Sequence, residues 1–316
     1  MPAIQPTPSP LFTRLVYAAF GLMAAVLMLS AYLRLSGAGF GCADWPACYG
    51  LDFADAAIIR QSNNPARLAH RLIAIALSLI IWAITMVAWQ RRTQAAGQWR
   101  AALLALFLTL FLSVLGIVTP GTRLPAVVLG NLLGGTALLA VLWWLLLDSR
   151  RLGAVVVGAR LRAAAWLGLL LVFVQIGLGG LVSANFAASA CTQFPACDAG
   201  WLEAWSWASF NPWRELVLQS NDAIAIPLDA AAIHVTHRVT AVATGIYLLW
   251  LGLAAASAGA ARYGKALAGL TVLQAFLGIA AVWFAHPLAV VLAHNALAAA
   301  MLLALLGLAY RPHHHA

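Results

Sequence analysis

The stretch that decides the fold is IHVTHRVTAVATGIYLLW, residues 233–250. It begins a long apolar segment and carries His237 and Arg238 near its start. The same opening occurs earlier in LAHRLIAIALSLIIWAI, with His70 and Arg71. An ionisable side chain in a bilayer core costs roughly 2.5 kcal/mol or more, so an intramembrane histidine is a candidate functional residue.

A second pair of segments matches in the same order along the chain. AVVLGN ends at Asn131, and AVVLAH ends at His294. LTLFLSVLGIV at 108–118 also resembles LTVLQAFLGIA at 270–280. The chain therefore contains an internal repeat, and its two copies differ where one has Asn131 and the other has His294.

Composition places the chain in a membrane. Hydrophobic residues make up 64% and charged residues 9% of its 316 positions, whereas a soluble domain carries about 25% charged residues. The net charge of +9 does not indicate nucleic-acid binding, because the arginines are spread between apolar segments. The polar, proline-rich residues 2–10 do not resemble a cleavable signal peptide.

A membrane-spanning helix needs about 20 apolar residues. The charge-poor runs predict eight spans, near 14–34, 68–90, 101–119, 125–147, 162–184, 231–255, 265–285 and 287–309. We predict an all-α integral membrane protein of two four-helix bundles, residues 1–150 and 151–316. An even number of spans in each half gives both copies one orientation, so a pseudo-twofold axis along the membrane normal is expected.

Arginine and lysine set the orientation of the spans. One side holds Arg14, Arg91, Arg92, Arg100, Arg150, Arg151, Arg160, Arg162, Arg262, Lys265 and Arg311; the other holds Arg34, Arg60, Arg67, Arg123 and Arg214. The side with more arginine and lysine is predicted to be cytoplasmic, and both termini are predicted to lie on that side. The long loops 35–67 and 185–230 are then outside a bacterial-type inner (cell) membrane.

All four cysteines fall in these two outer loops. Cys42 and Cys48 lie in GCADWPACYG, and Cys191 and Cys197 lie in ACTQFPACDAG. An even count on the oxidising side of a membrane predicts two disulfides, one in each loop. Free thiols in a reducing compartment are the alternative, which the predicted topology opposes. The second loop also carries a tryptophan-rich stretch, 201–213, expected to be a structural lid rather than a docking surface.

The four repeated positions, His70, Asn131, His237 and His294, fall at similar depth in the outer half of the membrane. Two neutral imidazoles on facing helices suit axial ligation of one haem iron within a bundle. His237 and His294 are the predicted pair, since an asparagine faces His70 and is a very poor iron ligand. The alternative for each is a histidine that bonds within the core.

Other side chains near these positions have weaker assignments. Arg71 and Arg238 lie at the aqueous edge, where a guanidinium can pair with a haem propionate. His234 faces a similar direction to His237 and is a supporting group or an alternative ligand. His286 falls in a turn, where a structural role is favoured.

On these features the chain resembles the heme A synthase family along nearly its whole length. The resemblance rests on eight spans in two halves, the paired loop cysteines, the CADWPACYG loop and the repeated His-Arg helices. That family oxidises a methyl group of haem O to the formyl group of haem A. The resemblance implies haem b held by His237 and His294, and a substrate pocket in the N-terminal half with His70 as catalytic residue and iron ligand, and Asn131 opposite it.

Two positions depart from the family pattern. The family usually has a second histidine where this chain has Asn131, and commonly a glutamate where it has Arg67. The leading hypothesis is an oxidoreductase that acts on haem O. It lies in the lipid bilayer, and haem O synthase or a terminal oxidase are its candidate assembly partners. A non-catalytic haem-binding or electron-transfer protein of the same fold is the alternative. A transporter is disfavoured, because no acidic residue lies inside a predicted span.

Overall fold

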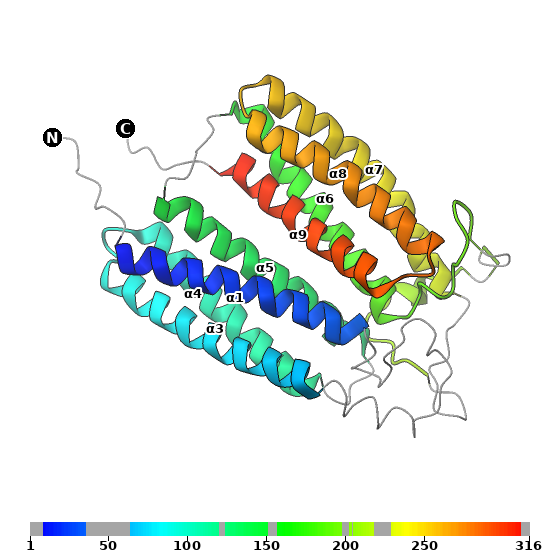
Figure 1. Ribbon diagram of the computed structural model, residues 1–316, viewed down its shortest axis with the longest axis horizontal. Helices are drawn as coiled ribbons and strands as arrows, with labels where there is room; N and C mark the ends of the chain where they lie inside the picture. Colours follow the sequence, from blue (N-terminus) through cyan, green and yellow to red (C-terminus); the bar gives the residue numbers. More distant parts are fainter. Residues whose placement is uncertain are drawn as a thin grey trace.

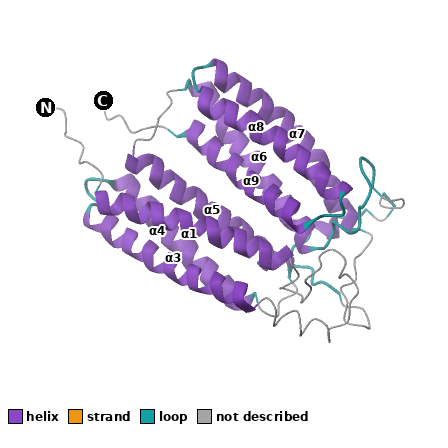
Figure 2. Ribbon diagram, in the orientation of Figure 1, coloured by secondary structure: helices purple, strands orange, loops and turns teal. Residues whose placement is uncertain are grey.

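The computed structural model describes residues 9–35, 64–119, 124–150, 157–197, 202–203, 205–217 and 229–310. Within these ranges the chain is helical, with loops and no strand (Figure 2). The long helices are α1 (Pro10–Leu35), α3 (Asn64–Gln90), α4 (Ala96–Val118), α5 (Pro125–Arg150), α6 (Ala159–Ala184), α7 (Ala230–Ser257), α8 (Ala261–Trp283) and α9 (Leu288–Ala309). All eight are long and apolar enough to cross a membrane, which confirms the predicted all-α membrane class.

The helices form two groups of four, side by side in Figure 1. In the first group, contacts run from α1 to α3, α3 to α4, α4 to α5 and α5 back to α1. In the second group, α6, α7, α8 and α9 contact one another in the same circular order. The groups meet through α5 with α6, α1 with α9 and α5 with α9.

The helices turn apolar side chains outward. On α3 the exposed residues recur every three or four positions, at Leu68, Leu72, Ile75, Leu79 and Trp82. This spacing places them on one face of a helix. A soluble helix would carry polar residues there, so the outward apolar face is the lipid-facing surface expected of a membrane span.

Helix ends differ from the predicted ones by a few residues. Helix α1 begins at Pro10 rather than 14, since proline lacks an N–H and suits a helix start. Helix α8 ends at Trp283 rather than 285, because Ala285 (φ 53°) and His286 (φ 59°) are in the left-handed region. Pro287 then precedes α9 as its N-cap residue rather than starting the helix.

Each bundle has its main core toward one end. In the second bundle this core includes Leu169, Leu248, Leu251, Leu267 and Leu305. In the first bundle the corresponding core is formed by Val16, Met23, Ile81, Ile84, Leu142 and Leu145. The four repeated positions singled out in the sequence all lie nearer the opposite ends of their helices.

Candidate functional site

His237 and His294 lie in the second bundle, each about two turns from the start of its helix, α7 or α9. Both residues are half-buried, and the two imidazoles are close enough to interact electrostatically. Nδ1 of His294 is buried and makes no hydrogen bond within the described residues. A buried imidazole nitrogen without a partner is costly, and a metal ligand is one way to satisfy it.

The layer that holds these histidines is loosely packed. No residue of 235–243 in α7 or of 288–298 in α9 is fully buried. Below this layer lies the leucine-rich core of the bundle, and above it a second cluster that includes Val182, Ala187 and Ile233. Protein interiors are normally close-packed, so a loosely packed layer between two packed clusters fits a bound group such as haem.

The first bundle repeats this layer around its own pair of residues. No residue of 65–76 in α3, which contains His70, is fully buried, and none of 128–133 in α5, which contains Asn131. The amide Nδ2 of Asn131 donates to Oγ1 of Thr119 at 2.8 Å, at the end of α4. The structure thus places His70 and Asn131 in equivalent helices to His237 and His294, with Asn131 bonded across helices.

The two arginines that follow the histidines have different surroundings. Arg71 is exposed. Arg238 is half-buried and donates to the backbone carbonyl oxygens of Gln193 (2.7 Å) and Cys191 (2.8 Å). Pairing of either arginine with a haem propionate stays a prediction, and Arg238 has a structural role that the sequence did not predict.

The C-terminal cysteine loop contains one of the two cysteine pairs predicted from the even number of cysteines. Cys191 and Cys197 are joined by a disulfide, with their Cα atoms 4.9 Å apart. Cys191 itself is buried. Cys42 and Cys48 lie outside the described residues, so their pairing stays a prediction.

His234 and His286 form a second pair of rings at the same end of the bundle. Their ring centroids are 6.1 Å apart, and both residues are buried. Burial, with a further contribution from the charge of Arg238, lowers the pKa of His286 to about 4. His286 is therefore neutral at physiological pH, which agrees with a structural role in the turn between α8 and α9.

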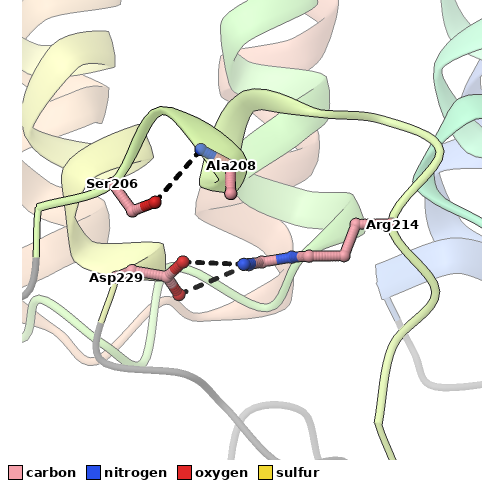
Figure 3. A network of polar contacts seen from close by, with 4 residues as sticks. All are labelled: Ser206, Ala208, Arg214 and Asp229. Carbon is pink, nitrogen blue, oxygen red and sulfur yellow. Dashed lines mark hydrogen bonds and ion pairs between the residues drawn. The ribbon is translucent and has the colours of Figure 1, made fainter.

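The tryptophan-rich segment crosses the end of the bundles as a fixed loop. Its short helix η1 (Trp207–Phe210) contacts α7, and Ser206 caps that helix by accepting from the amide of Ala208 at 3.2 Å. Arg214 pairs with Asp229 at the start of α7 at 2.7 Å (Figure 3). The carbonyl of Pro212 accepts from the amide of Ala126 in α5 at 2.7 Å. The loop therefore ties the two bundles together, as a structural lid would.

Two further residues of the site are not among those predicted from the sequence. The side-chain amide of Gln175 contacts the ring of His237, and that of Gln274 contacts the ring of His294. Each glutamine is followed four residues later by a glycine, Gly179 or Gly278. This repeated spacing is the signal in the sequence that could have identified them.

These features define a class of protein: a membrane protein of two four-helix bundles with paired polar residues in a loosely packed layer of each. Comparison with known proteins gives the family. The family COX15-CtaA, described as cytochrome oxidase assembly protein, matches residues 66–306. The chain belongs to this family, which confirms the predicted membership of the heme A synthase family.

Curated relatives extend the similarity to almost the full length. A protein named heme A synthase from Shewanella oneidensis is 33% identical over 305 residues, which are 90% of this chain and 92% of the relative. The heme A synthase of Rhizorhabdus wittichii is 29% identical, covering 75% of this chain and 68% of its own. That of Methylobacterium radiotolerans is 33% identical over 54% of this chain and 46% of its own.

Proposed function

We propose that this protein is a membrane oxidoreductase that converts the methyl group of haem O to the formyl group of haem A. Membership of the family and relatives named heme A synthase support the reaction. The observation that carries the assignment to residues is the loosely packed layer between two packed clusters, with His237 and His294 inside it. Conversion of a methyl to a formyl group removes four electrons and adds one oxygen atom, so an external oxidant and a source of oxygen are needed.

We assign the two halves different tasks. In the half comprising residues 151–316, His237 and His294 would hold a haem b, since neutral imidazoles are common ligands of haem iron. A bound haem b would supply one-electron transfer. The half comprising residues 1–150 would bind the substrate haem, with His70 directed at its iron. Asn131 is a very poor iron ligand, which favours a single protein ligand in that half, and its Nδ2 donates to Thr119.

We further propose the orientation given by the arginine and lysine distribution. Both termini would be cytoplasmic, and the cysteine loops would lie on the outer face of the inner membrane. The disulfide of Cys191 and Cys197 supports an oxidising compartment for that loop. Haem O synthase, as the source of substrate, and terminal oxidase, as the user of product, are the candidate assembly partners.

The direct test is haem analysis after expression in a host that makes haem O but not haem A. Haems extracted from these membranes should include haem A when the wild-type chain is present. His70→Ala should abolish haem A while haem b remains in the protein. Unchanged haem O in the presence of folded, haem-loaded protein would overturn the enzymatic assignment and favour the non-catalytic haem-binding alternative.

A further inference from the structure

Two helices that flank the candidate haem ligands carry the same short motif. Helix α6 has QIGLG at 175–179, and α8 has QAFLG at 274–278. A spacing of four residues places the glutamine and the glycine on one face of a helix. That face of α6 meets His237, and that of α8 meets His294.

On α6 the glutamine is held by several hydrogen bonds. Its Nε2 lies 2.9 Å from Nδ1 of His237 and donates to the backbone oxygen of the same residue at 2.7 Å. Its Oε1 accepts from Oγ1 of Thr240 at 2.8 Å. A Cβ atom added at Gly179 would lie 3.2 Å from Cε1 of His237. The ring is therefore fixed on one side by an amide and on another by the bare backbone of α6.

On α8 the arrangement is similar, with a different ring nitrogen. Nε2 of Gln274 lies 3.1 Å from Nε2 of His294. A Cβ atom added at Gly278 would lie 3.3 Å from Cε1 of the ring. Both imidazoles thus place Cε1 against a glycine and a ring nitrogen against a glutamine.

The first bundle lacks the glutamines. Helices α1 and α6 have 26 residues each, and alignment of the loop cysteines places Val26 and Ser30 where α6 has its glutamine and glycine. The repeat on α4 has Leu112 in place of the glutamine and Gly116 in place of the glycine. Paired glutamines therefore occur only in the bundle that has two histidines.

We propose that Gln175 and Gln274 are positioning residues for the two imidazoles, and that Gly179 and Gly278 provide the space in which the rings lie. This inference rests on the proposed haem site. A hydrogen bond to a metal-binding histidine fixes the orientation and tautomer of its ring. A carboxamide carries both donors and an acceptor, and for Gln175 the bonds to the backbone oxygen of His237 and from Thr240 fix which end of the amide faces the ring.

The test replaces each glutamine with methionine, which has a similar shape and cannot donate a hydrogen bond. In Gln175→Met and Gln274→Met, haem b should transfer to apomyoglobin about tenfold faster than in the wild type, as expected for loss of a partner of a metal ligand. The low-spin EPR signal should also shift or broaden, because it depends on the relative orientation of the two ring planes. Thr271→Val on α8 is the matched control, since among the residues that the structure describes Oγ1 of Thr271 bonds to its own helix at Leu267.

Substitution of the glycines provides a second, independent test. Gly278→Ala should alter the EPR signal, whereas Gly269→Ala on the same helix should not, because a Cβ atom there meets no atom of the described part of the chain within 4 Å. If Gln175→Met fails to fold, Thr240→Val removes one partner of the amide and should shift the same signal. Variants whose haem transfer and EPR signal equal those of the wild type would overturn the proposal. A wild-type protein without a low-spin haem would instead overturn the haem site on which it rests.

Discussion

The guanidinium of Arg238 donates a hydrogen bond of 2.8 Å to the carbonyl oxygen of Cys191. A second bond, of 2.7 Å, reaches the carbonyl of Gln193 in the same loop. The residue that follows His237 therefore fixes the disulfide loop against the start of α7. This contact links a candidate iron ligand to the outer loop through a single peptide bond.

Removal of this contact should loosen the loop. In Arg238→Ala the disulfide of Cys191 and Cys197 should be reduced by a water-soluble phosphine about tenfold faster, since hydrogen bonds from a charged donor contribute about 1.5–3 kcal/mol. Alkylation followed by mass spectrometry measures the rate. Arg71→Ala, at the equivalent but exposed position, is the control and should leave the rate unchanged. Equal rates in Arg238→Ala and wild type would show that the loop is held by other contacts.

The ion pair between Arg214 and Asp229 should make stability depend on pH. Burial alone would raise the pKa of Asp229, but the hydrogen bonds and the charge of Arg214 outweigh it and hold the pKa below its ordinary value of 3.8. The stabilisation is therefore present above pH 3.8 and is lost as the pH falls through the lower, folded-state pKa. A partly buried pair contributes about 1 kcal/mol, or about 1–2 °C in the thermal midpoint of a protein of this size.

Asp229→Asn tests this contribution. At pH 6 its thermal midpoint in detergent should lie below that of the wild type by this amount, and the difference should shrink as the pH falls below 3.8. A difference that persists unchanged at the lower pH would show that Asp229 acts through packing rather than charge.

Close packing of α7 against α8 depends on a glycine. A Cβ atom at Gly264 would lie 2.5 Å from the backbone nitrogen of Ala256 and 2.5 Å from the carbonyl oxygen of Gly252. Backbone atoms cannot move aside as a side chain can, so Gly264→Ala should destabilise the protein by about 1–3 kcal/mol. Gly269→Ala should be neutral or stabilise by up to about 1 kcal/mol, since alanine is the better helix former. Thermal unfolding in detergent measures both, and equal midpoints would refute the close contact.

The spans and their repeat could be predicted because both depend on local sequence. Charge-free apolar runs predict where the membrane spans lie. The similar segments around His70 and His237 predict the division of the chain into two halves. The end of α8 was missed because no glycine marks it: Ala285 and His286 adopt the left-handed backbone there.

The site could be predicted only in part. Histidines in an apolar span are conspicuous, whereas Gln175 is a single neutral residue whose role depends on which helix lies beside it. That neighbour is set by the circular order of α6 to α9, which spacing along the chain does not give. The lid was expected from its tryptophans, but its ion pair joins positions 15 residues apart in the sequence.

The last prediction concerns the half that has only one histidine. Nδ2 of Asn131 donates to Oγ1 of Thr119 at 2.8 Å, and an asparagine side chain is a very poor iron ligand. We expect a haem in this half to be ligated by His70 alone and to be high-spin. Asn131→His places an imidazole where the second bundle has His294 and should give a six-coordinate, low-spin site. Resonance Raman and EPR with haem supplied measure the change.

Thr119→Val is the matched control for this substitution. It frees the amide of Asn131 without adding an iron ligand, so the spin state should stay that of the wild type. A low-spin site in Asn131→His but not in Thr119→Val would show that residue 131 faces the iron bound by His70. Identical spectra in wild type and Asn131→His, with one haem per chain in both, would show that the first bundle does not bind a second haem. The substrate pocket would then have to lie elsewhere, because a haem O held in this bundle must add to the haem count.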